Sequence, residues 1–167
     1  MSNAVPMSHS RSFQTHLVLP PDTNHHQSIF GGRVLAYIDE IAAITSMKHA
    51  RSEVVTASFD SVDFISPAYA GDILELEAMV TSTGRSSMEV YVRVMSRNIK
   101  TGVEKLTTES FVTMVAVNKE GKPIPVPSVY PETEREKQLF ETGHTRRQLR
   151  QAKKESTQKR RLLLENE

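Results

Sequence analysis

The sequence predicts an α+β protein in which an antiparallel sheet wraps around one long helix. Apolar residues recur with helical spacing in one segment, residues 33–50, and with a period of two in the segments that follow. The links between the alternating segments are short, which favours antiparallel pairing. A helix that is apolar over most of its circumference needs cover on several sides, and a sheet curved around it provides that cover.

The first expected strand is RSFQTHLVLP, residues 11–20, which stops at the Pro20-Pro21 pair because proline cannot continue a hydrogen-bonded ladder. The helix follows at RVLAYIDEIAAITSMKHA, residues 33–50. Its apolar positions at 3.6-residue spacing are Val34, Ile38, Ile41, Ala42 and Thr45.

Four further strands are expected after the helix. The first covers residues 53–67 and ends at Pro67, and alternating apolar residues mark the next two over 74–80 and 88–94. The last is a long strand over residues 103–118. The segments TSTGRSS and RNIKTG separate the last three strands with turn-forming residues. The predicted order is therefore strand, helix and four strands.

Composition excludes several classes of protein. A chain of 167 residues with 38% hydrophobic and 25% charged residues suits one globular domain. With no cysteine, disulfides, thiolate metal ligands and cysteine nucleophiles are excluded, so catalysis must use oxygen or nitrogen groups. No apolar run is long enough to span a membrane and the N-terminus lacks a secretory signal, so we expect a cytoplasmic protein.

Three regions are predicted along the chain. Residues 1–10 are expected to be disordered or to include a tag remnant, which residues 2–4 resemble; 11–130 form the folded domain; and 131–167 form a charged helical tail. From His144 to Arg161 the tail carries eight basic residues and one acid. This density suits either contact with phosphates or a solvated helix.

The segment NHHQSIFGG, residues 24–32, lies directly before the helix. His25 and His26 are adjacent and have no other ligand at metal-binding spacing, so no metal site is predicted. Gly31 and Gly32 start the helix, where backbone N–H groups and the helix dipole favour an oxyanion or a polarised carbonyl. The alternative is that the two glycines only permit a tight turn.

Asp39 is a carboxylate within the predicted helix. Small side chains surround it at Ala36, Ala43 and Ser46, so a ligand or another backbone could approach, as a general base or nucleophile requires. A hydrogen-bonded structural acid is the alternative. Asp39 lies about 10 Å along the helix axis from Gly32, too far for both to act on one carbonyl. A composite site at a two-fold dimer interface would bring them together.

The stretches DTNHHQSIFGGRVLAYIDEIAA and VVTASFDSVDFISPAYAGDILELEAMVTSTGRSSMEVYVRV resemble the hotdog-fold acyl-CoA thioesterases, in particular the bacterial acyl-CoA hydrolases related to the brain-type enzymes. The resemblance spans roughly residues 13–127 and leaves out the tail. It implies the hotdog fold, in which an antiparallel sheet wraps one long central helix. It also implies homodimers with sheets joined edge to edge, and homohexamers built as trimers of dimers.

The same resemblance implies roles for individual residues. Asp39 would activate water or attack the thioester directly, Asn24 would orient the water or stabilise the developing charge, and Gly32 with Gly31 would polarise the carbonyl through backbone N–H groups. Thr56 matches a position near the thioester. The turn implied to contact coenzyme A comprises Gly84, Arg85, Ser86 and Ser87. Basic tail residues offer further phosphate contacts, but no motif favours one among Arg146, Arg147 and Arg150.

The leading function is hydrolysis of acyl-CoA to free acid and coenzyme A, in fatty acid metabolism, with no metal or cofactor beyond the coenzyme A of the substrate. An enoyl-CoA hydratase is a second possibility, but it usually needs an Asp-His pair and Asp39 has no histidine at a suitable spacing. The third is a non-catalytic acyl-CoA sensor that contacts nucleic acid, which would need a helix-turn-helix segment, and none is visible. No nucleic-acid or membrane partner is predicted.

Overall fold

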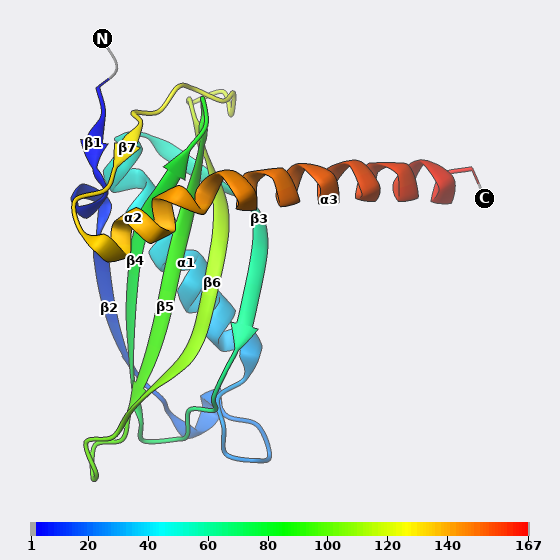
Figure 1. Cartoon of the computed structure of the whole chain (residues 1–167). Coiled ribbons are helices and arrows are strands. Elements are labelled where there is room, and N and C mark those ends of the chain that lie inside the picture. The colour runs from blue at the N-terminus through cyan, green and yellow to red at the C-terminus, as the bar shows by residue number, and fades with distance from the viewer. Residues whose placement is uncertain (1–2, 167) are drawn as a thin grey trace.

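In the computed structural model, which describes residues 3–166, one sheet separates two layers of helices (Figure 1). Helix α1 (Gly31–Ala50) lies on one face of the sheet, and α2 (Glu134–Glu141) and α3 (Gly143–Leu164) cross the other. The five strands are antiparallel and lie in the order β2 (Ser12–Leu17), β4 (Ile73–Thr83), β5 (Ser87–Arg97), β6 (Glu104–Val117) and β3 (Glu53–Phe64). The predicted order of one strand, a helix and four strands is confirmed for this five-stranded sheet.

Helix α1 packs its apolar stripe against the concave face of the sheet. The five positions with helical spacing are all buried, as the periodicity predicts. The opposite face of α1 is open to solvent, with Ala36, Glu40 and Met47 among its exposed residues. Within one chain only one side of the helix is therefore buried, whereas its sequence predicts burial on several sides.

The N-terminal segment differs from the disorder expected for residues 1–10. β1 (Val5–Pro6) pairs in parallel with β7 (Val129–Tyr130), and the 3-10 helix η1 (Met7–Ser10) follows. The side chain of Met7 is fully buried in the core, and the Ser10 hydroxyl accepts a 2.9 Å hydrogen bond from the backbone N–H of Val80. Burial of an apolar side chain holds this segment in place. Residues 1 and 2, where the proposed tag remnant begins, lie outside the described range.

The Pro-rich segment 121–131 is tied to α1 through His49. Nε2 of this buried histidine lies 2.7 Å from the carbonyl oxygen of Pro127. A carbonyl can only accept, so Nε2 carries the proton. Burial lowers the pKa of His49, which favours the neutral ring, although the same hydrogen bond opposes the shift.

Two buried glutamates hold the tail helices on the convex face of the sheet. Glu89 accepts hydrogen bonds from Arg146 at 2.8 Å and from Arg150 at 2.5 Å, both from α3. Glu77 pairs with Arg135 of α2 at 3.3 Å and also with Arg11 and Arg93. These contacts order the first half of the tail.

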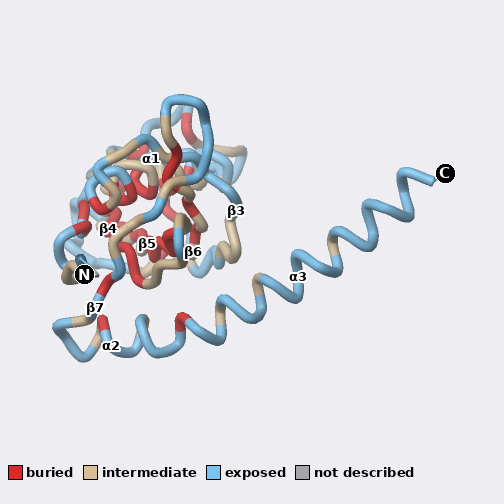
Figure 2. The backbone as a smooth tube through the Cα atoms, turned by 90° about the horizontal axis from the view of Figure 1, so that it is seen from above, coloured by how far each residue is buried: buried red, intermediate tan, exposed pale blue. Residues whose placement is uncertain are grey.

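Beyond Arg150, helix α3 leaves the body of the protein and is almost wholly exposed (Figure 2). The tail is helical, as its composition predicts. Among residues 3–166, no helix combines the length and the hydropathy that a membrane span requires.

Candidate active site

The loop before α1 is a tight turn organised by Asn24. Its side-chain Oδ1 accepts hydrogen bonds from the backbone N–H groups of His26 and Ser28, at 2.9 and 3.3 Å. Gln27 takes a left-handed conformation, with φ of 62°, and its N–H bonds to the carbonyl oxygen of Asn24. The Nδ2 amide group of Asn24 donates to no group within the described residues. It is therefore available to a water molecule or a substrate.

The start of α1 presents two backbone donors. The N–H groups of Gly31 and Gly32 make no hydrogen bond within residues 3–166, and no side chain caps this helix end. A Cβ atom at Gly32 would meet nothing within 4 Å, so the surface here is open. Asn24, in the loop, and Gly31 and Gly32, at the helix start that follows it, are together called the corner; the free N–H groups of the two glycines and the helix dipole suit a carbonyl oxygen that gains negative charge.

Asp39 and Thr56 form a second group. The Thr56 hydroxyl, on edge strand β3, donates a 2.6 Å hydrogen bond to Oδ1 of Asp39 on α1. Oδ2 accepts no hydrogen bond within the described residues, so it is free to accept a proton from water. Thr56 is exposed and Asp39 is half-buried. No hydrogen bond joins this pair to the corner, so the described chain does not unite the two halves of the predicted site.

An apolar cavity of about 320 Å³ lies beside the corner. Residues of the α1 start, of the end of β3 and of the segment after β3 line it, among them Val34, Phe64, Ile65 and Ala68. The Phe64 ring lies against Gly31, where an added Cβ would come within 3.1 Å of Cζ. Gly31 is therefore needed for this close approach. Sequence reasoning did not identify Phe64; its only signal was an apolar residue at the end of a predicted strand.

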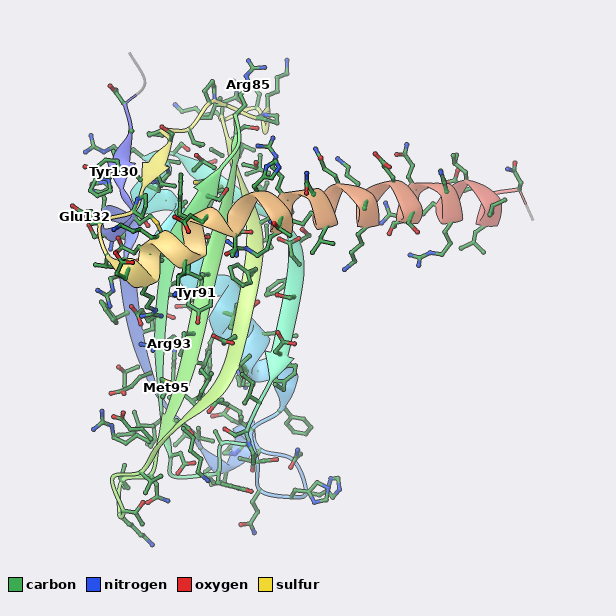
Figure 3. All side chains as sticks on the ribbon, in the orientation of Figure 1. Arg85, Tyr91, Arg93, Met95, Tyr130 and Glu132 are labelled. Atoms are coloured by element: carbon green, nitrogen blue, oxygen red, sulfur yellow. The ribbon has the colours of Figure 1, made fainter. Side chains whose placement is uncertain are left out.

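The turn Gly84–Ser87 lies at the end of the β4–β5 hairpin, far from the corner, and Figure 3 labels Arg85 there. Three backbone bonds hold it: the N–H of Gly84 donates to Ser87, and the carbonyls of Arg85 and Ser86 accept from Val126 and Ala116. The turn is thus a rigid polar surface with an exposed arginine.

The histidines of the chain are not part of the corner or of the Asp39–Thr56 pair. The rings of His25 and His26 pack on each other with centroids 3.9 Å apart, and both residues are exposed. Within residues 3–166, no set of three or more His, Asp or Glu side chains is placed to hold a metal ion. His49 is occupied by Pro127, and His16 stacks on Tyr37.

The convex face carries a further polar network that sequence reasoning missed. The Tyr91 hydroxyl donates a 2.5 Å hydrogen bond to Glu109, and burial together with this carboxylate raises the pKa of Tyr91 to about 12. Tyr91 and Arg93 lie along β5 on the face that the tail helices cross (Figure 3). This network lies under the tail and does not adjoin the corner.

Comparison with known proteins decides the family. A family model described as the thioesterase superfamily matches residues 26–103, from the loop before α1 through β5. YkhA of Bacillus subtilis, an uncharacterized acyl-CoA thioester hydrolase, is 46% identical over 89% of this chain and 87% of its own length. The chain belongs to the thioesterase superfamily.

The thioesterase fold extends over nearly all of the chain. The crystal structure of an apo-hexameric acyl-CoA thioesterase is 65% identical and aligns with a TM-score of 0.88, over 90% of this chain and 96% of that one. An acyl-CoA hydrolase of Staphylococcus aureus in complex with butyryl coenzyme A is 47% identical, with a TM-score of 0.90, over 96% of this chain and 98% of that one. The hotdog arrangement inferred from the sequence is thereby confirmed.

A relative with a longer chain is also similar. The cytosolic acyl coenzyme A thioester hydrolase of Rattus norvegicus is 37% identical over 84% of this chain, which corresponds to 37% of the rat protein. The similarity therefore concerns a part of that enzyme.

Proposed function

We propose that this thioesterase hydrolyses acyl-CoA to a free carboxylic acid and coenzyme A, at a site built from the corner of one chain and the Asp39–Thr56 pair of another. The proposal rests on the separation of the corner from the Asp39–Thr56 pair within one chain. Two free helix-start N–H groups suit the thioester oxygen, whereas the carboxylate that could activate water lies two helical turns away.

The proposed reaction starts with water bound to Oδ2 of Asp39 and to the amide of Asn24. Asp39 accepts a proton from this water as its oxygen attacks the thioester carbon. In the variant of this step the carboxylate itself attacks the carbon, the thiolate leaves, and water then hydrolyses the resulting anhydride. The negative charge that develops on the carbonyl oxygen is stabilised by the N–H groups of Gly32 and Gly31. The C–S bond then breaks, and the leaving thiolate takes up the proton that Asp39 accepted from the water. The chemistry needs no metal or cofactor.

Structures of related enzymes support the choice of residues. Three structures of the Staphylococcus aureus acyl-CoA hydrolase carry an alanine in place of an asparagine, an aspartate or a threonine, and the asparagine variant is in complex with coenzyme A. Those three residues are 15 and 17 positions apart, and Asn24, Asp39 and Thr56 have the same separations. A thioesterase from another relative carries an aspartate-to-alanine change.

The proposed assembly is a homodimer that further associates into a hexamer. Edge strand β3 has 12 residues, one unpaired side, and exposed apolar residues such as Val55 and Phe64, which suits edge-to-edge pairing with a second copy. Three related thioesterases are described as hexameric. The cytoplasmic location expected from the sequence stays a prediction; the rat relative is named as cytosolic.

The cavity beside Gly31 is proposed to take the acyl chain, because it is mainly apolar and opens next to the N–H groups assigned to the thioester. The hydratase alternative has less support. No histidine donates to or accepts from Asp39 among the described residues, and His49, which is buried, is bonded to Pro127.

A thiol-release assay over a series of acyl-CoA lengths tests the function. Wild-type protein should release coenzyme A, and Asp39→Ala should lose activity by several orders of magnitude, because the group that accepts the water proton is gone. We expect Asn24→Ala to lower kcat by about 10²-fold, by analogy with loss of an oxyanion donor. Full hydrolysis by Asp39→Ala would overturn the assignment, and a change mainly in KM would make Asn24 a binding residue.

A further inference from the structure

Arg147 on the tail helix lies beside the β4–β5 turn and differs from its neighbours on α3. Arg146 and Arg150 are one helical turn apart and both bind the buried Glu89. Arg147 lies about 100° around the helix from Arg146, so it cannot share that partner. Its Nη2 atom would be 3.7 Å from a Cβ atom built on Gly84, and its Cζ atom 3.9 Å. Arg147 is therefore directed at the turn.

The position of the helix over the turn is fixed at two points. Gly143 at the start of α3 is buried and packs on β4, since a Cβ atom there would lie 3.2 Å from the Cβ of Ser82. Glu89 then anchors the next turns through its two arginines, with a side chain only 1% exposed. These contacts place Arg147 beside Gly84 without using its own charge.

Two guanidinium groups at this turn have no partner among the residues that the structure describes. Neither Arg85 nor Arg147 makes a side-chain hydrogen bond or an ion pair within residues 3–166, and both are exposed. They flank Gly84 on a turn held by three backbone hydrogen bonds, next to the hydroxyls of Ser86 and Ser87. Arginine binds phosphate with two parallel N–H groups, so this pair suits a ligand with several phosphoryl oxygens.

We infer that Arg147, together with Arg85, binds phosphate groups of the coenzyme A part of the substrate, which makes the tail helix a part of the substrate site. The inference rests on the proposed function, which supplies the ligand. It divides the tail arginines by role: Arg146 and Arg150 hold the helix to the sheet, and Arg147 contacts the nucleotide end of the substrate.

Binding of two ligands tests this division. Titration calorimetry would compare coenzyme A with pantetheine, which lacks all of the phosphates. For Arg147→Gln we expect coenzyme A to bind about tenfold more weakly, the loss of one charge-assisted contact, and pantetheine to bind as to the wild type. Arg160→Gln, the same change on the exposed end of α3, is the control and should bind both ligands normally. Arg147→Lys should recover part of the affinity because it retains the charge.

Unchanged coenzyme A affinity in Arg147→Gln would overturn the inference. So would an equal loss for both ligands, because a damaged fold does not distinguish phosphate; the midpoint of thermal unfolding would show such damage. In acyl-CoA hydrolysis, Arg147→Gln should raise KM and leave kcat unchanged. A wild-type protein that binds coenzyme A but cleaves no acyl-CoA would contradict the proposed function, and the binding comparison would still decide the role of Arg147.

Discussion

In the proposed site, the hydrogen bond from Thr56 to Asp39 fixes the orientation of the carboxylate that would act on the substrate. It occupies Oδ1 and leaves Oδ2 free, so one oxygen is positioned and the other can act as a base. We therefore expect Thr56→Val to lower kcat about tenfold while KM changes little, since a hydrogen bond to a charged group is lost from a group that must be oriented.

Thr56→Ser is the matched variant, because it keeps the hydroxyl and loses only a methyl group. Its kcat in the thiol-release assay should stay close to that of the wild type. Equal losses in Thr56→Val and Thr56→Ser would show that the methyl group, and not the hydrogen bond, matters.

Individual site residues were partly visible in the sequence. Asp39 stands out because a carboxylate interrupts the apolar pattern of a helix, and the glycine pair because it starts that helix, whereas Asn24 and Thr56 were assigned only through the family resemblance. Phe64 did not stand out, since its contact with Gly31 depends on the end of β3 returning to the start of α1, some 30 residues earlier in the chain. The partnership of Thr56 with Asp39 likewise arises only when β3 packs beside the helix.

At the scale of elements, Glu89 determines where α3 lies. Its side chain is 1% exposed and is surrounded by Arg146, Arg150 and the Thr81 hydroxyl. Removing one member of a buried ion pair typically costs about 3–5 kcal/mol, because the remaining charges lose their partner. We expect Glu89→Ala to lower the free energy of unfolding by about 3 kcal/mol and to free α3 for proteolysis.

Denaturant unfolding and limited trypsin digestion measure these two effects. Glu104→Ala is the control, because Glu104 is exposed and its pair with Arg97 lies on the surface, where such pairs contribute less than about 1 kcal/mol. Equal effects of the two substitutions would contradict the anchoring role of Glu89.

Glu77 makes the attachment of α2 sensitive to acid. Burial alone would raise the pKa of its carboxyl, but the hydrogen bond from Arg11 and the charges of Arg135 and Arg93 outweigh burial and lower the pKa. A lowered pKa in the folded protein stabilises it above the unfolded value of about 4.5, and this contribution is lost as the pH falls through the folded value.

The free energy of unfolding of Glu77→Gln should therefore be lower than that of the wild type above about pH 5. The difference should shrink as the pH falls below about 4.5. Denaturant unfolding of both proteins across this range measures it. A difference in free energy of unfolding that grows toward acid pH would show that Glu77 does not stabilise the fold as a carboxylate.

Helices and strands were predicted correctly from the sequence where a local hydrophobic pattern was enough to identify them. The period of two marked β4 and β5, and the period of 3.6 marked α1, because each burial pattern repeats locally. The docking of the tail was not predicted. Glu77 and Glu89 occupy alternate strand positions that are typical of a solvated face, and the arginines that cover them come 57 to 61 residues later. No local pattern connects them.

At the scale of the whole molecule, the proposed composite site requires that two chains cooperate. The corner with Asn24 and the pair with Asp39 lie on separate parts of one chain, and the edge strand that carries Thr56 has a free side for a second copy. In a two-fold dimer each chain then supplies the corner of one site and the carboxylate of the other.

Mixing two inactive variants tests this arrangement. In a dimer of an Asp39→Ala chain with an Asn24→Ala chain, one site carries both substitutions and the other carries neither. If the chains reassort at random from an equal mixture, half of the dimers are mixed and each has one intact site, so activity should recover to about a quarter of the wild-type level. If each subunit held a complete site, every site would keep one substitution. Mixed dimers, identified by two different affinity tags, that show no recovery would place the whole site within one chain.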